Sequence, residues 1–109
     1  MDVGEIARKI KDYVNADIPL IRLIPVATQI SNYLDEVSKE ILQGNLDYET
    51  VRTELIEILK PALEHGLKLQ GDLDTVSEKL ADSLVSYLKY RVSLSQGSIR
   101  LSKRRGFFS

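Results

Sequence analysis

The sequence predicts an all-α fold: a four-helix up-and-down bundle followed by a basic C-terminal arm or a small β-hairpin. Apolar residues recur at intervals of three and four in four segments, which is the spacing of one face of a helix. The connections between these segments are short, as they are between antiparallel neighbours in a bundle. After Tyr90 the helical spacing ends and no acidic residue follows. We therefore assign residues 1–90 to the helical bundle and residues 91–109 to the arm.

The first helix is expected over about residues 3–15. Asp2 and Glu5 form the pattern of a capping box, with aspartate in place of the usual serine or threonine. The following apolar residues share one face of this helix: Val3, Ile6, Ala7, Ile10, Tyr13 and Val14. This face is expected to point into the core.

The second helix is expected to begin irregularly. Asp17 is a suitable N-cap, but Pro19 and Pro25 each lack a backbone hydrogen-bond donor. The simplest prediction is a short helical piece followed by a kink near Pro25. The regular face then consists of Val26, Ile30, Tyr33, Leu34, Val37 and Ile41. Gly44 is expected to end the helix, since glycine adopts the left-handed C-cap conformation without strain.

Two further helices complete the predicted bundle. Asp47 is expected to cap the third helix, Pro61 to bend or break it, and the turn at Gly71 to end it. Its inward face consists of Val51, Leu55, Ile58, Leu59, Ala62 and Leu63. The fourth helix is expected over about residues 73–90. Its inward face consists of Val76, Leu80, Leu84 and Leu88.

The arm has a different pattern of apolar residues. Val92, Leu94, Ile99 and Leu101 alternate with polar residues on either side of Gln96-Gly97. Alternation around a glycine-containing turn predicts a β-hairpin. The alternatives are that the fourth helix continues through this segment or that the segment is a disordered tail.

The charge of the chain is unevenly distributed. The net charge is -1, but residues 1–82 hold nine basic residues against all 16 acidic ones, which gives -7. Residues 83–109 hold six basic residues and no acidic one, which gives +6. Such a difference between segments indicates that the basic segment has an electrostatic partner of its own.

The residue types exclude several kinds of chemistry. The chain has no cysteine, which excludes disulfides, thiolate ligands and thiol nucleophiles. His65 is the single histidine, and Ala62 stands where a helical di-iron site needs an acidic residue. The glycines are too widely separated to form a phosphate-binding loop. We therefore expect no enzymatic activity, no cofactor and no metal.

One catalytic alternative stays open. Glu54 and Glu57 are three positions apart, and Glu78 and Asp82 are four apart, so each pair shares a helix face. Two such pairs on neighbouring helices can bind Mg²⁺ through carboxylate oxygens. The pattern resembles the site of helical nucleotide pyrophosphohydrolases, in which both pairs are spaced by three. Magnesium-dependent nucleotide hydrolysis is therefore a third candidate function.

The N-terminal segment predicts the location of the protein. Acidic residues interrupt its apolar ones, so it lacks the basic start and continuous apolar stretch of a secretory signal. The longest apolar stretch, residues 18–27, contains Arg22 and two prolines and is too short to span a bilayer. We expect a cytoplasmic protein without a membrane partner.

Two sets of residues are candidates for binding. Cations in the arm are suited to bind phosphates, and its two phenylalanines to stack on bases. The residues expected to contact DNA or RNA are Arg91, Arg100, Lys103, Arg104, Arg105, Phe107 and Phe108. A second set either belongs to the core, with Arg22 pointing outward, or forms a docking surface for a protein partner or a second copy of the chain. This set consists of Leu20, Ile21, Leu23 and Ile24.

These observations favour a non-enzymatic accessory or interaction module. In the leading hypothesis the basic arm binds nucleic acid while the bundle docks on a protein partner. The alternative is a purely protein-binding adaptor or assembly subunit. Salt-dependent binding of DNA or RNA would separate the two.

Overall fold

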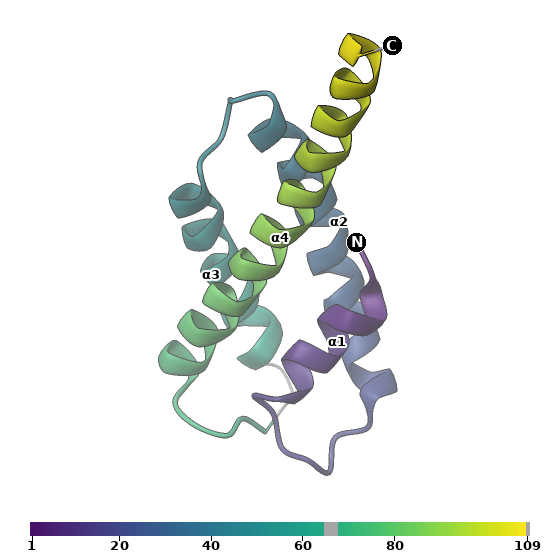
Figure 1. Ribbon diagram of the computed structural model, residues 1–109. Helices are drawn as coiled ribbons and strands as arrows, with labels where there is room; N and C mark the ends of the chain where they lie inside the picture. Colours follow the sequence, from purple (N-terminus) through teal and green to yellow (C-terminus); the bar gives the residue numbers. More distant parts are fainter. Residues whose placement is uncertain (65–67, 109) are drawn as a thin grey trace.

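The computed structural model describes the backbone of residues 1–64 and 68–108 and the side chains of residues 1–64 and 68–95. The protein is mostly helical. In this part of the chain its elements are α1 (Val3–Lys11), a 3₁₀ helix η1 (Leu20–Leu23), α2 (Ile24–Leu42), α3 (Tyr48–Glu64) and α4 (Leu73–Phe108) (Figure 1). None of the helices in the described ranges is both long enough and apolar enough to cross a membrane.

Helix α1 begins as predicted but ends earlier. Asp2 is its N-cap, and the Asp2 carboxylate accepts a hydrogen bond of 3.3 Å from the backbone N–H of Glu5. The helix ends at Lys11 instead of about residue 15. The backbone after it pairs with residues 68–70. The Asn15 N–H donates to the Lys68 carbonyl at 2.7 Å, and the Gln70 N–H donates to the Tyr13 carbonyl at 3.0 Å. These bonds across the fold replace the last predicted turn of helix.

The short helical piece before α2 is confirmed: residues Leu20–Leu23 form the 3₁₀ helix, and α2 begins directly afterwards at Ile24. The prediction that Asp17 caps this piece is wrong, because the N-cap is Pro19 and no side chain caps the helix. Pro25 lies in the first turn of α2, where its missing N–H would have no partner within the helix. The chain turns after α2 at Gly44, which has a φ of +79°, as expected for a glycine that ends a helix.

Helix α3 differs from the prediction at its C-terminal end. Asp47 caps it, with its carboxylate accepting a hydrogen bond of 2.8 Å from the backbone N–H of Thr50. The helix continues through Pro61 to Glu64, so of the two predicted outcomes, a bend or a break, the break is wrong. Helical structure also ends before the predicted turn at Gly71. His65 lies outside the described residues.

The predicted β-hairpin after Tyr90 is wrong, because α4 continues to Phe108. Val92 follows Leu88 by four positions, which places both on one helix face, and it is buried at 3% exposure. Neither glycine nor proline interrupts the chain between them. Helical spacing therefore explains the first of the alternating apolar residues, and the alternative of a continued fourth helix is the one observed.

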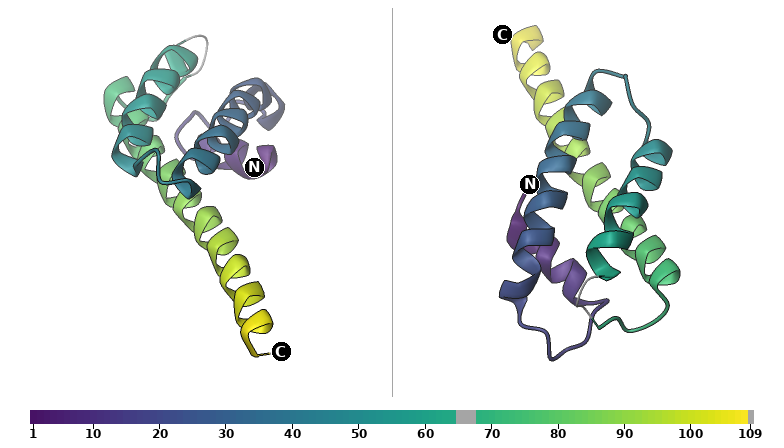
Figure 2. Two further views of the ribbon diagram at one scale, coloured as in Figure 1. Left: turned by 90° about the horizontal axis from the view of Figure 1, so that it is seen from above. Right: turned by 180° about the vertical axis from the view of Figure 1, so that it is seen from behind.

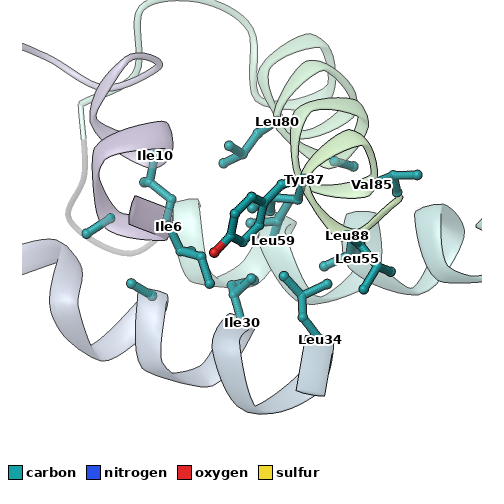
Figure 3. Packing of buried hydrophobic residues seen from close by; sticks show 14 of the residues in the cluster. Ile6, Ile10, Ile30, Leu34, Leu55, Leu59, Leu80, Val85, Tyr87 and Leu88 are labelled. Carbon is teal, nitrogen blue, oxygen red and sulfur yellow. The ribbon is translucent and has the colours of Figure 1, made fainter. Parts of the chain in front are cut away.

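The helices pack in two pairs around one apolar core. Helix α3 lies along α4, and α1 lies along α2; both α1 and α2 also contact α4 (Figures 1 and 2). The inward faces predicted for the four segments supply this core. Figure 3 shows side chains of all four helices meeting there, among them Ile6, Ile30, Leu59 and Leu88. Burial of these side chains is the main source of stability.

Helix α4 determines the length of the molecule. A helix of 36 residues is about 54 Å long, and the longest dimension of the protein is 56 Å. The C-terminal part of α4 extends beyond the ends of the other helices (Figure 2). The basic segment of the sequence therefore lies largely on a helix that leaves the body of the protein.

Candidate functional site

The residues expected to bind nucleic acid lie in the extending part of α4. Its backbone is helical through Phe108, so six of these seven residues follow one another along one helix. They are Arg100, Lys103, Arg104, Arg105, Phe107 and Phe108, and their side chains lie outside the described residues. Arg91, the seventh, is exposed near the point where α4 leaves the body.

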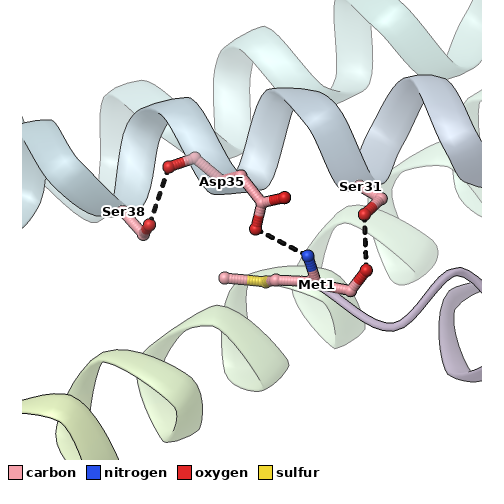
Figure 4. A network of polar contacts seen from close by, with 4 residues as sticks. All are labelled: Met1, Ser31, Asp35 and Ser38. Atoms are coloured by element: carbon pink, nitrogen blue, oxygen red, sulfur yellow. Dashed lines mark hydrogen bonds and ion pairs between the residues drawn. The ribbon is translucent and has the colours of Figure 1, made fainter.

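Arg91 lines a pocket of about 160 Å³ between α2 and α4, which also includes Asp35, Ser38 and Val92. The Asp35 carboxylate forms an ion pair of 2.6 Å with the Met1 amine. The Met1 carbonyl accepts a hydrogen bond of 2.6 Å from Ser31 Oγ, so the first residue is held on α2 at both ends (Figure 4). These contacts fix the start of the chain beside the segment of α4 that carries Arg91.

Another basic residue of the C-terminal segment contacts α3. Lys89 Nζ lies 5.2 Å from the centre of the Tyr48 ring, within the range of a cation–π interaction. Lys89 therefore packs against the body, while Arg91 lies at the edge of the body.

A groove between α1 and α4 has a volume of about 400 Å³. We call it the α1–α4 groove. Three residues of α1, its C-cap residue and two tyrosines of α4 line it: Glu5, Arg8, Lys9, Asp12, Tyr87 and Tyr90. The first four of these are two cations and two carboxylates, so the α1 side of the groove has no net charge.

The two tyrosines of the α1–α4 groove have different environments. Tyr87 is 8% exposed, and its hydroxyl points away from α4 toward Ile6 (Figure 3). Lys9 Nζ lies 5.4 Å from the centre of the Tyr87 ring. Burial, and then the nearby Glu5 carboxylate, raise the pKa of Tyr87. Tyr90, by contrast, is 60% exposed.

The order of residues alone does not predict the α1–α4 groove. Its one available signal was the charged face of α1, where Glu5, Arg8, Lys9 and Asp12 recur at intervals of three and four. Such a row is typical of any solvated helix face. Only the packing of α1 against α4 brings it beside the tyrosines.

One carboxylate of each pair considered for magnesium has another partner. Glu54 accepts a hydrogen bond from the hydroxyl of Tyr33 on α2. Asp82 forms an ion pair of 2.5 Å with Arg52 Nε, and this hydrogen bond raises the pKa of Arg52. In residues 1–64 and 68–95, no three acidic or histidine side chains are grouped so that they could hold a metal ion.

The four apolar residues considered for docking are divided between core and surface. Leu23 is fully buried, so the core interpretation applies to it. Ile24 is partly buried against the core. Leu20 and Ile21 are 36% and 77% exposed, which leaves these two for a docking surface.

Comparison of the chain with protein families, with curated proteins and with solved structures gives no match.

Proposed function

We propose that this protein is a non-enzymatic accessory module in which a four-helix up-and-down bundle docks on a protein partner and the C-terminal part of α4 binds nucleic acid. One observation carries the proposal. Helix α4 continues beyond the other helices, and no acidic residue follows Asp82 in a segment with six basic residues. A projecting helix of this charge can approach a phosphate backbone while most of the acidic body stays away from it.

The charge of the body supports the same orientation. Residues 1–82 carry a net charge of -7, so phosphates are repelled from most of the body and attracted to the C-terminal segment. Binding through phosphates releases condensed counterions and is therefore weakened by salt. Four phosphate contacts predict a log–log slope of affinity against salt of about -3 to -4.

Fluorescence anisotropy of the full chain with labelled oligonucleotides over a salt series tests this proposal. Replacement of Arg100, Lys103, Arg104 and Arg105 with serine is expected to weaken binding equally for all sequences, since phosphate contacts carry no base information. It is also expected to flatten the salt dependence.

A matched control removes the same charge from the body. Four exposed basic residues suit this purpose: Arg22, Lys39, Lys68 and Lys79. Their replacement with serine is expected to change the slope little, because they are not proposed to contact phosphates. Equal effects of the two variants, or an affinity no better than millimolar at low salt, would contradict the proposal.

The purely protein-binding alternative is favoured by a different observation. Ile21 is 77% exposed and follows Leu20 in η1, the 3₁₀ helix directly before α2. Under this alternative, Ile21→Ser abolishes self-association measured by sedimentation velocity, and the full chain binds neither DNA nor RNA.

A further inference from the structure

The α1–α4 groove lies on α4 just before the segment proposed to bind phosphates. Tyr90 lines the groove, Arg91 is the next residue, and about 15 Å of helix separates Tyr90 from Arg100. Proteins that bind single strands contact about 4–16 nucleotides per domain, so one strand can span this distance. The groove and the basic helix are therefore within reach of the same ligand.

Tyr90 has the exposure that base stacking requires. It is 60% exposed, although tyrosine is large and partly apolar. The ring of Tyr87 is unsuitable, because it is buried and Lys9 lies over it. An exposed aromatic ring beside cations is the usual platform for an unpaired base.

The charged residues of the α1–α4 groove favour a base over a simple anion. The charges of Arg8 and Lys9 are balanced by those of Glu5 and Asp12, so the groove has no net positive charge that would attract a simple anion. Carboxylates accept hydrogen bonds from the exocyclic amino groups of bases, and cytosine is read in this way by acidic side chains. The two cations remain suited to the phosphate of the same nucleotide.

We propose that the α1–α4 groove binds an unpaired base of a single-stranded nucleic acid, with the base stacked on Tyr90. Glu5 and Asp12 accept hydrogen bonds from an exocyclic amino group, and Arg8 contacts the adjacent phosphate. This inference rests on the proposed function, because the basic part of α4 holds the rest of the strand. It adds a preference for single strands with amino-bearing bases, which phosphate contacts alone do not provide.

Anisotropy titrations of the full chain with strands of about 12 nucleotides, within the size range of such sites, test the groove. Tyr90→Leu is expected to weaken binding to a cytosine-rich single strand by about 5- to 150-fold, the usual range for loss of one stacked base. The salt slope and the affinity for a duplex are expected to stay the same. Tyr90→Phe keeps the ring and is expected to bind within about twofold of the original chain, since stacking uses the π-face.

Further variants test the other roles. Leu94→Ala is the matched control, because Leu94 is exposed on α4 one turn after Tyr90 and does not line the groove. It is expected to leave binding unchanged. Arg8→Gln is expected to reduce the salt slope by about 0.7, the value for one phosphate contact on a single strand. Glu5→Gln together with Asp12→Asn is expected to reduce the preference for cytosine-rich over thymine-rich strands.

The outcomes separate this inference from the proposed function. If Tyr90→Leu binds single strands as well as the original chain, while serine at the four C-terminal basic positions abolishes binding, the groove inference is overturned and the proposed function stands. If no oligonucleotide binds, both are overturned. Titration with cytidine monophosphate distinguishes a free nucleotide from a strand as the source of the base. If the chain binds this nucleotide through Tyr90 but binds no oligonucleotide, the ligand of the groove is a free nucleotide.

Discussion

Val92 tests where the folded body of this protein ends. The charge and spacing of the sequence place a boundary between Tyr90 and residue 91. In the structure, however, Val92 is 3% exposed and belongs to the core cluster. We expect Val92→Ala to destabilise the protein, although the residue lies in the segment assigned to the arm.

The magnitude follows from the burial of Val92. The substitution removes two buried methyl groups, each worth about 0.8 kcal/mol. The cavity left behind adds to this loss, and the higher helix propensity of alanine offsets about 0.5 kcal/mol of it. The free energy of unfolding is therefore expected to fall by about 1–2 kcal/mol.

Urea unfolding followed by circular dichroism measures this change. Ile21→Ala is a suitable control, because Ile21 is 77% exposed and its truncation is expected to cost less than about 0.5 kcal/mol. Two shortened chains give an independent comparison. A chain ending at Ser95 is expected to keep the stability of the body, and a chain ending at Tyr90 to lose about 1–3 kcal/mol because it lacks Val92.

Two results together would refute this reasoning. One is a change of less than about 0.5 kcal/mol for Val92→Ala, the usual limit for surface substitutions. The other is equal stability of the two shortened chains. The folded body would then end at Tyr90, as the sequence pattern predicts.

Three further experiments test the core and its polar contacts. Leu84→Ala is expected to lower the free energy of unfolding by about 2–5 kcal/mol, because Leu84 is fully buried; a loss under about 1 kcal/mol in urea unfolding would contradict its place in the core. Burial, followed by the hydrogen bond to Glu54, raises the pKa of Tyr33, so this tyrosine contributes stability that is present below about pH 10 and lost as the pH rises toward its folded pKa. Urea unfolding at a series of pH values should therefore show a steeper alkaline loss for the original chain than for Tyr33→Phe, whereas parallel losses would exclude this linkage. The ion pair of Arg52 with Asp82 is exposed, so a double-mutant cycle is expected to give a coupling no larger than that of an ordinary surface ion pair; a larger value would mean that the pair is shielded from water.

The ends of several elements follow from local sequence. The aspartates at positions 2 and 47 cap α1 and α3, and Gly44 takes the positive φ expected after α2. Each of these features depends on hydrogen bonds or torsion angles within about one helical turn. Residues close in sequence are sufficient to specify them.

Local sequence is insufficient where distant segments interact or where two periods of apolar residues overlap. Helix α1 ends early because Asn15 and its neighbours pair with the segment before α4. The apolar residues after Tyr90 alternate, but Val92 also continues the helical face of Leu88, and burial against the core favours the helix. Leu23 and Ile21 are both apolar, yet only Leu23 enters the core.

The four apolar faces, their caps and the separation of acidic from basic residues are all properties of the chain itself. They can be read from the order of residues because helix periodicity and charge do not depend on a partner. The α1–α4 groove is different: its charged face and its tyrosines come from segments more than 70 residues apart. A helix face specifies that it will be buried or exposed, but not which other helix it will meet. Packing of α1 against α4 therefore decided that Tyr90 lies beside Arg8 and Lys9, and with it the site proposed for the unpaired base.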